Sequence, residues 1–161
     1  MRLFERLVLK DSIEIEATPE EIWDFFANLE RNYKAWHPED HVSFKWIKGR
    51  PMESGSTWYA EEILGGGSRR LKGKGTIGEV IANRKIVFKF PFPMSIVSPG
   101  FEWHIEPKGT GSVFTAVSYV RCCEFFRLIA RSHVDANIEA GKKHVREEGE
   151  NLKKLLEEKG S

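Results

Sequence analysis

The pair of residues with the clearest potential for chemistry is His144 and Glu148, which are four positions apart near the C-terminal end of the chain. In an α-helix such residues are neighbours on one face, and a helical projection puts both on the apolar stripe that contains Leu152 and Leu155. A carboxylate on an apolar stripe is costly without a partner. An imidazole and a carboxylate at this spacing can supply two ligands to a metal ion. The alternative is a solvated His–Glu pair at the edge of the stripe.

Further ligands for such an ion would come from earlier in the chain, where His41 and Glu62 are the candidates. His41 ends the run Trp36–His41, for which a surface loop with an aromatic anchor is the alternative interpretation. Strand alternation puts Glu62 on the more apolar face of its segment and Glu61 on the other. Two histidines and two glutamates suit a borderline divalent ion, with zinc as the leading candidate. The choices between Glu61 and Glu62, and between His37 and His41, remain open at this stage.

Three polar side chains are candidates for a general acid or a hydrogen-bond donor to a substrate, namely Tyr33, His37 and His133. His133 shares a helical face with His144 but lies about three turns away, too far to bind the same metal ion. Together with Asn137, it is predicted to line a cavity farther along the helix. A histidine in the core or at the rim is an equally good interpretation of His133.

The elements that must position these residues follow from the periodicity of the sequence. Alternation of apolar and polar residues predicts a strand over Leu7–Glu16. Thr18 and Glu21 have the spacing of a capping box, and Pro19 suits the first turn, so a helix is predicted to begin there. Residues Arg31–His41 are expected to form a connection without regular structure.

Six further strands are predicted, in segments separated by glycine and proline: Val42–Lys48, Ser56–Leu64, Arg69–Ile81, Lys85–Phe92, Phe101–Glu106 and Val113–Val120. A hairpin turn is predicted at Gly65–Gly67. The residues from about Phe125 to Lys159 are predicted to form one long helix. Gly141 and Gly149 lie inside it, and they indicate either a close approach to the helix backbone or simple tolerance.

This order of elements predicts a single α+β domain over residues 1–161, in which a curved antiparallel sheet grips the long helix and leaves a cavity between them. A chain of this length can bury enough surface to enclose such a cavity. Four aromatic residues are predicted to line an apolar pocket for a ligand, with ordinary core packing as the alternative for each: Trp58, Phe88, Phe90 and Trp103.

The layout resembles the helix-grip fold of the START and polyketide-cyclase (SRPBCC) superfamily, which also includes Bet v 1-like proteins. The resemblance covers nearly the whole chain and rests on three stretches: Ala17–Trp23 after the first strand, Trp36–Pro38 before the second, and Glu150–Leu156 in the last helix. Members of that superfamily bind lipids and hormones, cyclise rings or hydrolyse substrates, so the fold alone does not assign the function.

The runs Trp36–His41 and Glu61–Gly66, followed by His144-x-x-x-Glu148, resemble the 2,4-diacetylphloroglucinol hydrolase family more specifically. That resemblance implies a zinc ion held by two histidines and two glutamates, and hydrolysis of the carbon–carbon bond between an acyl group and a phenolic ring. It also implies that Tyr33 holds a phenolic oxygen. The implied metal ligands are His41, Glu62, His144 and Glu148.

Composition excludes several other classes of protein. The 161 residues include 25 Lys and Arg against 24 Asp and Glu, which gives a net charge of +1. Without a basic excess, there is no general argument for binding to nucleic acid or to an anionic membrane, although a local basic patch is still compatible with this charge. The adjacent Cys122 and Cys123 cannot link distant segments. The longest uncharged run, 90–101, is too short for a membrane span. The N-terminus lacks the apolar stretch of a signal peptide, so we expect a cytoplasmic protein. A homodimer remains an open alternative.

The segment Gly73–Gly78 matches the GxGxxG pattern of dinucleotide-binding loops. That loop must follow a strand and open a helix, whereas this segment lies within a strand pattern and precedes another strand. Small residues on a curved strand explain it better.

The sequence therefore supports a zinc-dependent hydrolase that acts on a hydrophobic aromatic ketone or polyketide-like substrate. The alternative is a carrier that binds a lipid or polyketide-like molecule without catalysis, in which His144 and Glu148 merely orient the ligand. Convergence of the four implied ligands within about 2–2.3 Å of one point would favour the hydrolase.

Overall fold

A computed structural model describes residues 4–63, 70–123 and 128–159 of the chain. The strands are β1 (Phe4–Ile15), β2 (His41–Lys48), β3 (Thr57–Ile63), β4 (Arg70–Ile81), β5 (Lys85–Lys89), β6 (Gly100–Lys108) and β7 (Gly111–Cys123). The helices are α1 (Pro19–Ala27), α2 (Leu29–Trp36), α3 (Met94–Val97) and α5 (Arg131–Lys159). The seven predicted strands and the helix-grip fold are confirmed, while the turn predicted at Gly65–Gly67 lies outside the described residues.

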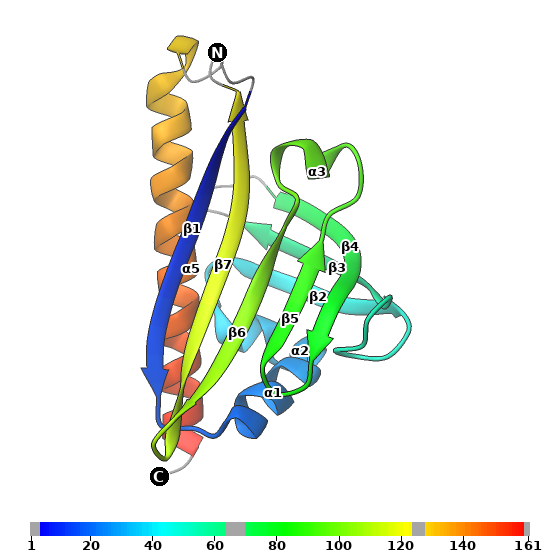
Figure 1. Cartoon of the computed structure of the whole chain (residues 1–161), viewed down its shortest axis with the longest axis vertical. Coiled ribbons are helices and arrows are strands. Elements are labelled where there is room, and N and C mark those ends of the chain that lie inside the picture. Colours follow the sequence, from blue (N-terminus) through cyan, green and yellow to red (C-terminus); the bar gives the residue numbers. More distant parts are fainter. Residues whose placement is uncertain (1–3, 64–69, 124–127, 160–161) are drawn as a thin grey trace.

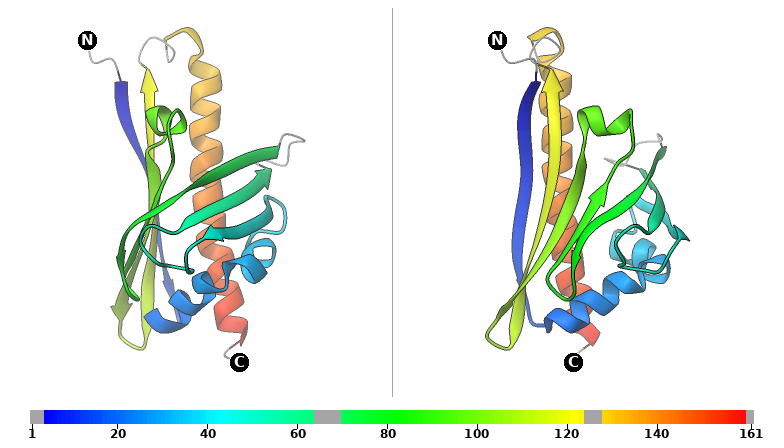
Figure 2. Two further views of the ribbon diagram at one scale, coloured as in Figure 1. Left: turned by 90° about the vertical axis from the view of Figure 1, so that its right-hand side faces the viewer. Right: turned by 45° about the vertical axis from the view of Figure 1, so that its right-hand side comes forward.

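The strands form one antiparallel sheet in the order β1-β7-β6-β5-β4-β3-β2. Strands β1 and β7 run along α5, whereas β2, β3 and β4 turn across it, so the sheet curves around the helix (Figures 1 and 2). The helices α1 and α2 lie at the lower end of the molecule beside the C-terminal part of α5 (Figure 2). These two helices therefore lie at one end of the space between the sheet and α5.

The start of α1 has the predicted capping box. The Thr18 hydroxyl accepts a hydrogen bond from the Glu21 backbone N–H at 3.2 Å, and the Glu21 carboxylate accepts one from the Thr18 N–H at 2.7 Å. Pro19 occupies the first turn, where its missing N–H is not needed. These local signals explain why α1 was predictable from sequence.

Helix α2 corrects the expectation of an irregular connection over Arg31–His41. Leu29, Tyr33 and Trp36 follow each other at helical spacing, and all three are buried. Only three buried positions mark this eight-residue helix, which is too short for its periodicity to be distinguished from an irregular connection. The consequence is functional, because α2 is the element that carries Tyr33 into the interior.

Helix α5 begins at Arg131 rather than near Phe125, a position outside the described residues. A Cβ atom added to Gly141 would lie 2.9 Å from Leu9 Cδ1, and one added to Gly149 would lie 3.3 Å from Ile13 Cγ2. Both glycines therefore mark the close approach of α5 to β1, which decides between the two interpretations of these residues.

Strand β4 contains the Gly73–Gly78 segment, which confirms that it is not a nucleotide-binding loop. A Cβ atom at Gly75 would lie 2.0 Å from the Lys89 carbonyl oxygen of β5, so a small residue is required there. In the described part of the chain, no helix is long and apolar enough to cross a bilayer.

An aromatic core lies between α1, α2 and the sheet. Phe26 stacks on Trp103 with ring centroids 4.2 Å apart and packs edge-on against Trp36. Phe88 stacks on Phe101 at 4.4 Å, is fully buried and does not line the cavity described below, so the structure places it in the core rather than in the predicted pocket wall. This core fixes α2 against the sheet.

Candidate active site

A cavity of about 590 Å³ lies between α5 and the concave face of the sheet. Its body is apolar and aromatic, with walls that include Leu9, Phe44, Trp58, Phe90, Phe101 and Trp103. Four polar side chains gather at one end of it, namely Tyr33, Glu62, His144 and Glu148. A cavity of this size, with few convergent polar groups, is typical of a site for a small apolar ligand.

Three of the four implied metal ligands converge at the polar end. His41 Nε2 lies 3.1 Å from Glu148 Oε1, and His144 Nε2 lies 3.4 Å from the same oxygen. One ligand atom from each of these residues lies within 4.8 Å of the others. His41 is fully buried, so this group is shielded from bulk water.

Each of these two imidazoles is held through its other nitrogen. His41 Nδ1 donates a hydrogen bond to the Tyr33 carbonyl oxygen at 2.9 Å, and His144 Nδ1 donates one to Asp40 Oδ2 at 2.9 Å. The Nε2 atoms of both rings are thereby turned toward Glu148. Outer partners of this kind fix the tautomer and orientation of metal-binding histidines.

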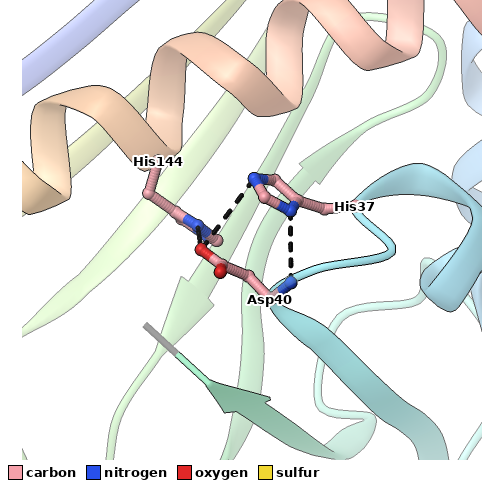
Figure 3. Close-up of side chains that lie close together, drawn as sticks. All are labelled: His37, Asp40 and His144. Carbon is pink, nitrogen blue, oxygen red and sulfur yellow. Dashed lines mark hydrogen bonds and ion pairs between the residues drawn. The ribbon is translucent and has the colours of Figure 1, made fainter. Parts of the chain in front are cut away.

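His37 lies behind His144 and does not line the cavity. Its Nδ1 accepts a hydrogen bond from the Asp40 backbone N–H at 3.3 Å, and its Nε2 lies 3.1 Å from Glu147 Oε2. The Asp40 carboxylate contacts both imidazoles through one oxygen, Oδ2 (Figure 3). The structure therefore places His37 as a support for Asp40, at a distance from any substrate in the cavity.

His37, Asp40 and His144 also lie within metal-ligand distance of one another. This second group is the poorer donor set, because His37 Nδ1 already accepts a backbone hydrogen bond and Asp40 already accepts one from His144. Of the two candidates His37 and His41, it is therefore His41 whose side chain faces Glu148.

Glu62 lies outside the group formed by His41, His144 and Glu148, and it contacts Tyr33 instead. The Tyr33 hydroxyl donates a hydrogen bond to Glu62 Oε1, and the Tyr33 ring stacks on the His41 ring with centroids 3.9 Å apart. Burial, together with the negative charges of Glu62 and Glu148, raises the pKa of Tyr33 well above its usual range. Tyr33 is therefore a neutral hydrogen-bond donor at physiological pH.

The pKa values of His144 and Glu148 depend on each other's charge. Burial opposes the positive charge of His144, but Glu148, with Glu62 and Asp40, raises its pKa to about 10. Burial likewise opposes the negative charge of Glu148, but His144 and His41 lower its pKa to about 2. Without a metal ion, the polar end therefore holds a buried imidazolium–carboxylate pair.

The other predicted site residues divide into two groups. Glu62 faces the cavity as predicted, whereas Glu61 faces away and contacts Tyr59, Arg70 and Lys72. Asn137, Trp58, Phe90 and Trp103 line the cavity. His133 is exposed in the first turn of α5 and is absent from the lining, because that turn lies beyond the part of the helix that borders the cavity.

Asp40 is the residue of the site that sequence reasoning missed. It is buried and bonded to His144, although it sits in a turn immediately before β2. Its neighbour His41 was identified by residue type, but no periodicity predicts the direction of a turn side chain. What marks Asp40 as a site residue is that its charged side chain is buried, and burial is visible only in the structure.

The profile of one protein family, described as polyketide cyclase / dehydrase and lipid transport, matches residues 6–157. The chain belongs to this family. A comparison with curated proteins found no match. As a member of the polyketide cyclase / dehydrase and lipid transport family, the chain shares the helix-grip architecture described above.

Solved structures are similar to this family member in fold. The KanY protein, solved in solution, is 16% identical, with a TM-score of 0.68 over 95% of this chain and 99% of that chain. TTHA0849 from Thermus thermophilus is 12% identical, with a TM-score of 0.68 over 96% and 100%. A norcoclaurine synthase point mutant from Thalictrum flavum, in complex with a transition-state analogue, is 16% identical, with a TM-score of 0.63 over the whole of both chains.

Proposed function

We propose that this protein is a divalent-metal-dependent hydrolase, with zinc as the leading metal, that acts on an aromatic ketone of the acylphenol type. The observation that carries this proposal is the pair of imidazoles whose Nε2 atoms both face Glu148 Oε1, at 3.1 and 3.4 Å. The resemblance of the sequence to the 2,4-diacetylphloroglucinol hydrolase family supports the reaction type.

The residues fit a zinc ion by their chemistry. His41 Nδ1 can only donate to the Tyr33 carbonyl, so Nε2 of the neutral His41 ring carries a lone pair, and this lone pair faces the carboxylate oxygen of Glu148. Two lone pairs directed at one place require a cation between them, which is either a proton or a metal ion. Two imidazoles and one carboxylate form a donor set that zinc uses in catalytic sites, where a fourth position stays open.

Glu62 has a different role in this proposal from the one that the resemblance implies. Its carboxylate is bonded to Tyr33 and is not among the ligand atoms that lie within 4.8 Å of one another. We assign His41, His144 and Glu148 as the metal ligands, and Glu62 as a base beside them. A carboxylate on the cavity wall, next to a neutral phenol, can accept a proton from water.

The reaction that suits this arrangement is hydrolysis of an aryl–acyl bond. Water adds its hydroxyl to the acyl carbon, the bond between that carbon and the ring breaks, and the ring carbon receives a proton, so that a phenol and a carboxylic acid are formed. A bound divalent ion would supply Lewis acidity toward the acyl carbonyl. Glu62 takes the proton from the attacking water and returns it to the ring carbon. The Tyr33 hydroxyl, whose own proton is donated to Glu62, accepts a hydrogen bond from a phenolic hydroxyl of the substrate.

The cavity supports the substrate class. Phe44, Trp58 and Phe101 present aromatic surface next to the polar end, which suits a planar phenolic ring. Apolar walls continue beyond them toward α3, so an acyl chain of several carbons has room. A volume of about 590 Å³ is ample for such a molecule.

The test is the metal content of the purified protein, measured by elemental analysis after exposure to Zn²⁺ and dialysis. We expect close to one zinc ion per chain in the wild type and in His133→Ala, the matched control on the exposed part of α5. His144→Ala should hold no stoichiometric zinc. Glu62→Gln should retain zinc but lose about 100-fold or more in turnover of 2,4-diacetylphloroglucinol, since a general base is removed. A wild type without zinc would overturn the proposal.

Asp40 offers a finer test of the same site. Asp40→Asn keeps the size of the side chain but weakens its bond to His144 Nδ1. Zinc affinity, measured by competition with a chelating dye, should fall about 10- to 100-fold. Glu147→Gln, which alters the outer contact of His37 and the contact with the exposed Lys143, should change it by less than about threefold. Equal effects of the two variants would contradict the assigned role of Asp40.

A non-catalytic carrier is the second candidate, and the size and apolar lining of the cavity favour it. In a carrier, Tyr33, His144 and Glu148 would orient a polar group of the ligand. Binding of an apolar phenol without turnover, in a protein that holds no zinc, would support the carrier over the hydrolase.

A further inference from the structure

The cavity reaches the surface at the end away from α1 and α2. Several of the residues that line it are also exposed to solvent, and they mark the place where it opens: Leu71, Lys72, Met94, Val97 and Asn137. These residues come from β4, α3 and α5. We call this opening the mouth.

Exposed apolar side chains gather around the mouth. In the described part of the chain, ten large apolar side chains are exposed, and seven of them lie on β4, around α3 or just before α5, toward the end of the molecule that holds the mouth: Leu71, Phe92, Met94, Ile96, Val97, Leu128 and Ile129. Phe92 and Leu128 are 79% and 82% exposed. Helix α3 and the start of α5 lie toward the same end of the molecule (Figures 1 and 2). We call these seven residues the apolar rim. Such clustering marks an interaction surface.

The charged residues that adjoin the rim are mostly basic. Arg70 and Lys72 flank Leu71, Lys74 follows on the same strand, and Arg131 follows Ile129; all four are exposed. The adjoining carboxylates are Glu61, which lies near Arg70 and Lys72, and Asp135, which lies near Arg131. Among the described residues named here, four cations therefore stand against two anions, although the whole chain has a net charge of only +1.

We propose that the apolar rim docks on an anionic lipid bilayer, with the mouth facing the membrane. Apolar side chains flanked by Lys and Arg are the chemistry that binds the interface of anionic lipids. A protein seated on the rim would seal the mouth, whereas a bilayer leaves it open to apolar molecules. A hydrophobic ligand would pass between membrane and cavity without crossing water. The proposal does not depend on a metal ion or on catalysis.

Vesicle co-sedimentation tests this proposal directly. The full chain is mixed with vesicles of phosphatidylcholine alone and of phosphatidylcholine with phosphatidylglycerol. We expect it to bind the anionic vesicles more strongly, and to bind them less as the salt concentration rises. The double variant Phe92→Glu with Ile96→Glu should lose at least about tenfold in partitioning, because two apolar anchors are replaced by anions.

The matched control is Ile47→Glu, on the edge strand β2 and outside the cavity lining. Ile47 is 60% exposed, so it offers an apolar side chain of similar accessibility. This variant should bind vesicles like the wild type. Circular dichroism and thermal unfolding check that each variant is folded, and exposure of all three positions makes unfolding unexpected.

Three results would overturn the proposal. One is the absence of binding to both kinds of vesicle. Another is an equal loss of binding in Ile47→Glu. The third is a concentration-dependent dimer in sedimentation experiments that the rim variant abolishes, without vesicle binding, which would make the rim an interface between copies of the chain. Because zinc content is measured separately, failure of the hydrolase proposal leaves this test unaffected.

Discussion

The two halves of α5 differ in what holds them in place. The three buried residues of the helix, Val145, Gly149 and Leu152, lie at its midpoint or in its C-terminal half. The N-terminal half has no buried residue and borders the cavity through Val134, Asn137 and Ile138 among others. One half is therefore fixed by packing within the protein, and the other faces space that a ligand would fill.

A direct hydrogen bond from α2 helps to hold the C-terminal half of α5 in place. Trp36 Nε1 donates a hydrogen bond to the Glu148 carbonyl oxygen at 2.8 Å, so α2 is tied to the backbone of α5 at the same residue whose side chain faces the two histidines. Leu152, one turn farther, is fully buried. The difference between the halves teaches that Glu148 lies where the helix is packed against the rest of the protein, whereas the less buried half borders the cavity.

The largest expected effect is at the boundary between the two halves, where His144 pairs with Glu148. His144→Ala removes the cation that pairs with Glu148 and leaves a buried carboxylate, which costs roughly 3–5 kcal/mol of unfolding free energy. His133→Ala, on the exposed half of the same helix, should cost less than about 0.5 kcal/mol. Urea denaturation of the metal-free protein measures both values. Similar losses in the two variants would show that the halves do not differ.

A second and smaller effect follows from pH. Because the pKa of His144 is raised from 6.5 to about 10, its stabilising contribution is complete below about pH 6.5 and is lost as the pH rises through 10. The pKa of Glu148 is lowered from 4.5 to about 2, so its contribution is complete above about pH 4.5 and is lost as the pH falls through 2. The metal-free protein should therefore be most stable between these limits.

The alkaline loss should amount to a few kcal/mol, read from urea midpoints between pH 6 and pH 10. Glu148→Gln removes the anion that raises the pKa of His144, so this variant should show a much flatter alkaline limb. A limb of unchanged steepness would contradict the coupling of this pair.

The smallest effect compares one glycine from each half. Alanine at either position gains about 1 kcal/mol of helix propensity. At Gly141, the new methyl group meets Leu9 Cδ1, the free end of a side chain that lines the cavity and can move into it. At Gly149, it meets Ile13, whose branched side chain is stiff. Thermal unfolding should therefore rank Gly141→Ala above Gly149→Ala in stability, by up to about 1 kcal/mol. The reverse order would contradict a loose N-terminal half.

Local sequence signals predict the elements of this fold well. The capping box at Thr18 and the alternation within strands act between near neighbours, so they survive without knowledge of the tertiary structure. The pairing of His144 and Glu148 is likewise a property of a single helix. The stripe of Leu29, Tyr33 and Trp36 is not recognised from sequence because the helix has only eight residues, and because its burial depends on packing against the sheet.

The rest of the site depends on contacts between distant segments. Tyr33 and Glu62 are 29 residues apart, and Asp40 and His144 are 104 apart. Residue type identified Glu62 and His41 as candidates, but their partners are set by how α2 and β2 meet α5. The exposure of His133 shows the same limit, because a helical wheel gives the face of a residue and not the length of helix that is covered.

The sheet order also has a consequence for how the protein folds. Strands β1 and β2 are the first two in the chain, yet they occupy opposite edges of the sheet, and β1 pairs with β7 so that Phe4 lies opposite Cys123. Closing such a long loop is slow, because its entropy is lost before the contacts form. His41 lies at one edge, and His144 and Glu148 arrive last from the end of the chain. We therefore expect the donor set to assemble only in the final folding step, so that metal uptake during refolding would report completion of the native topology.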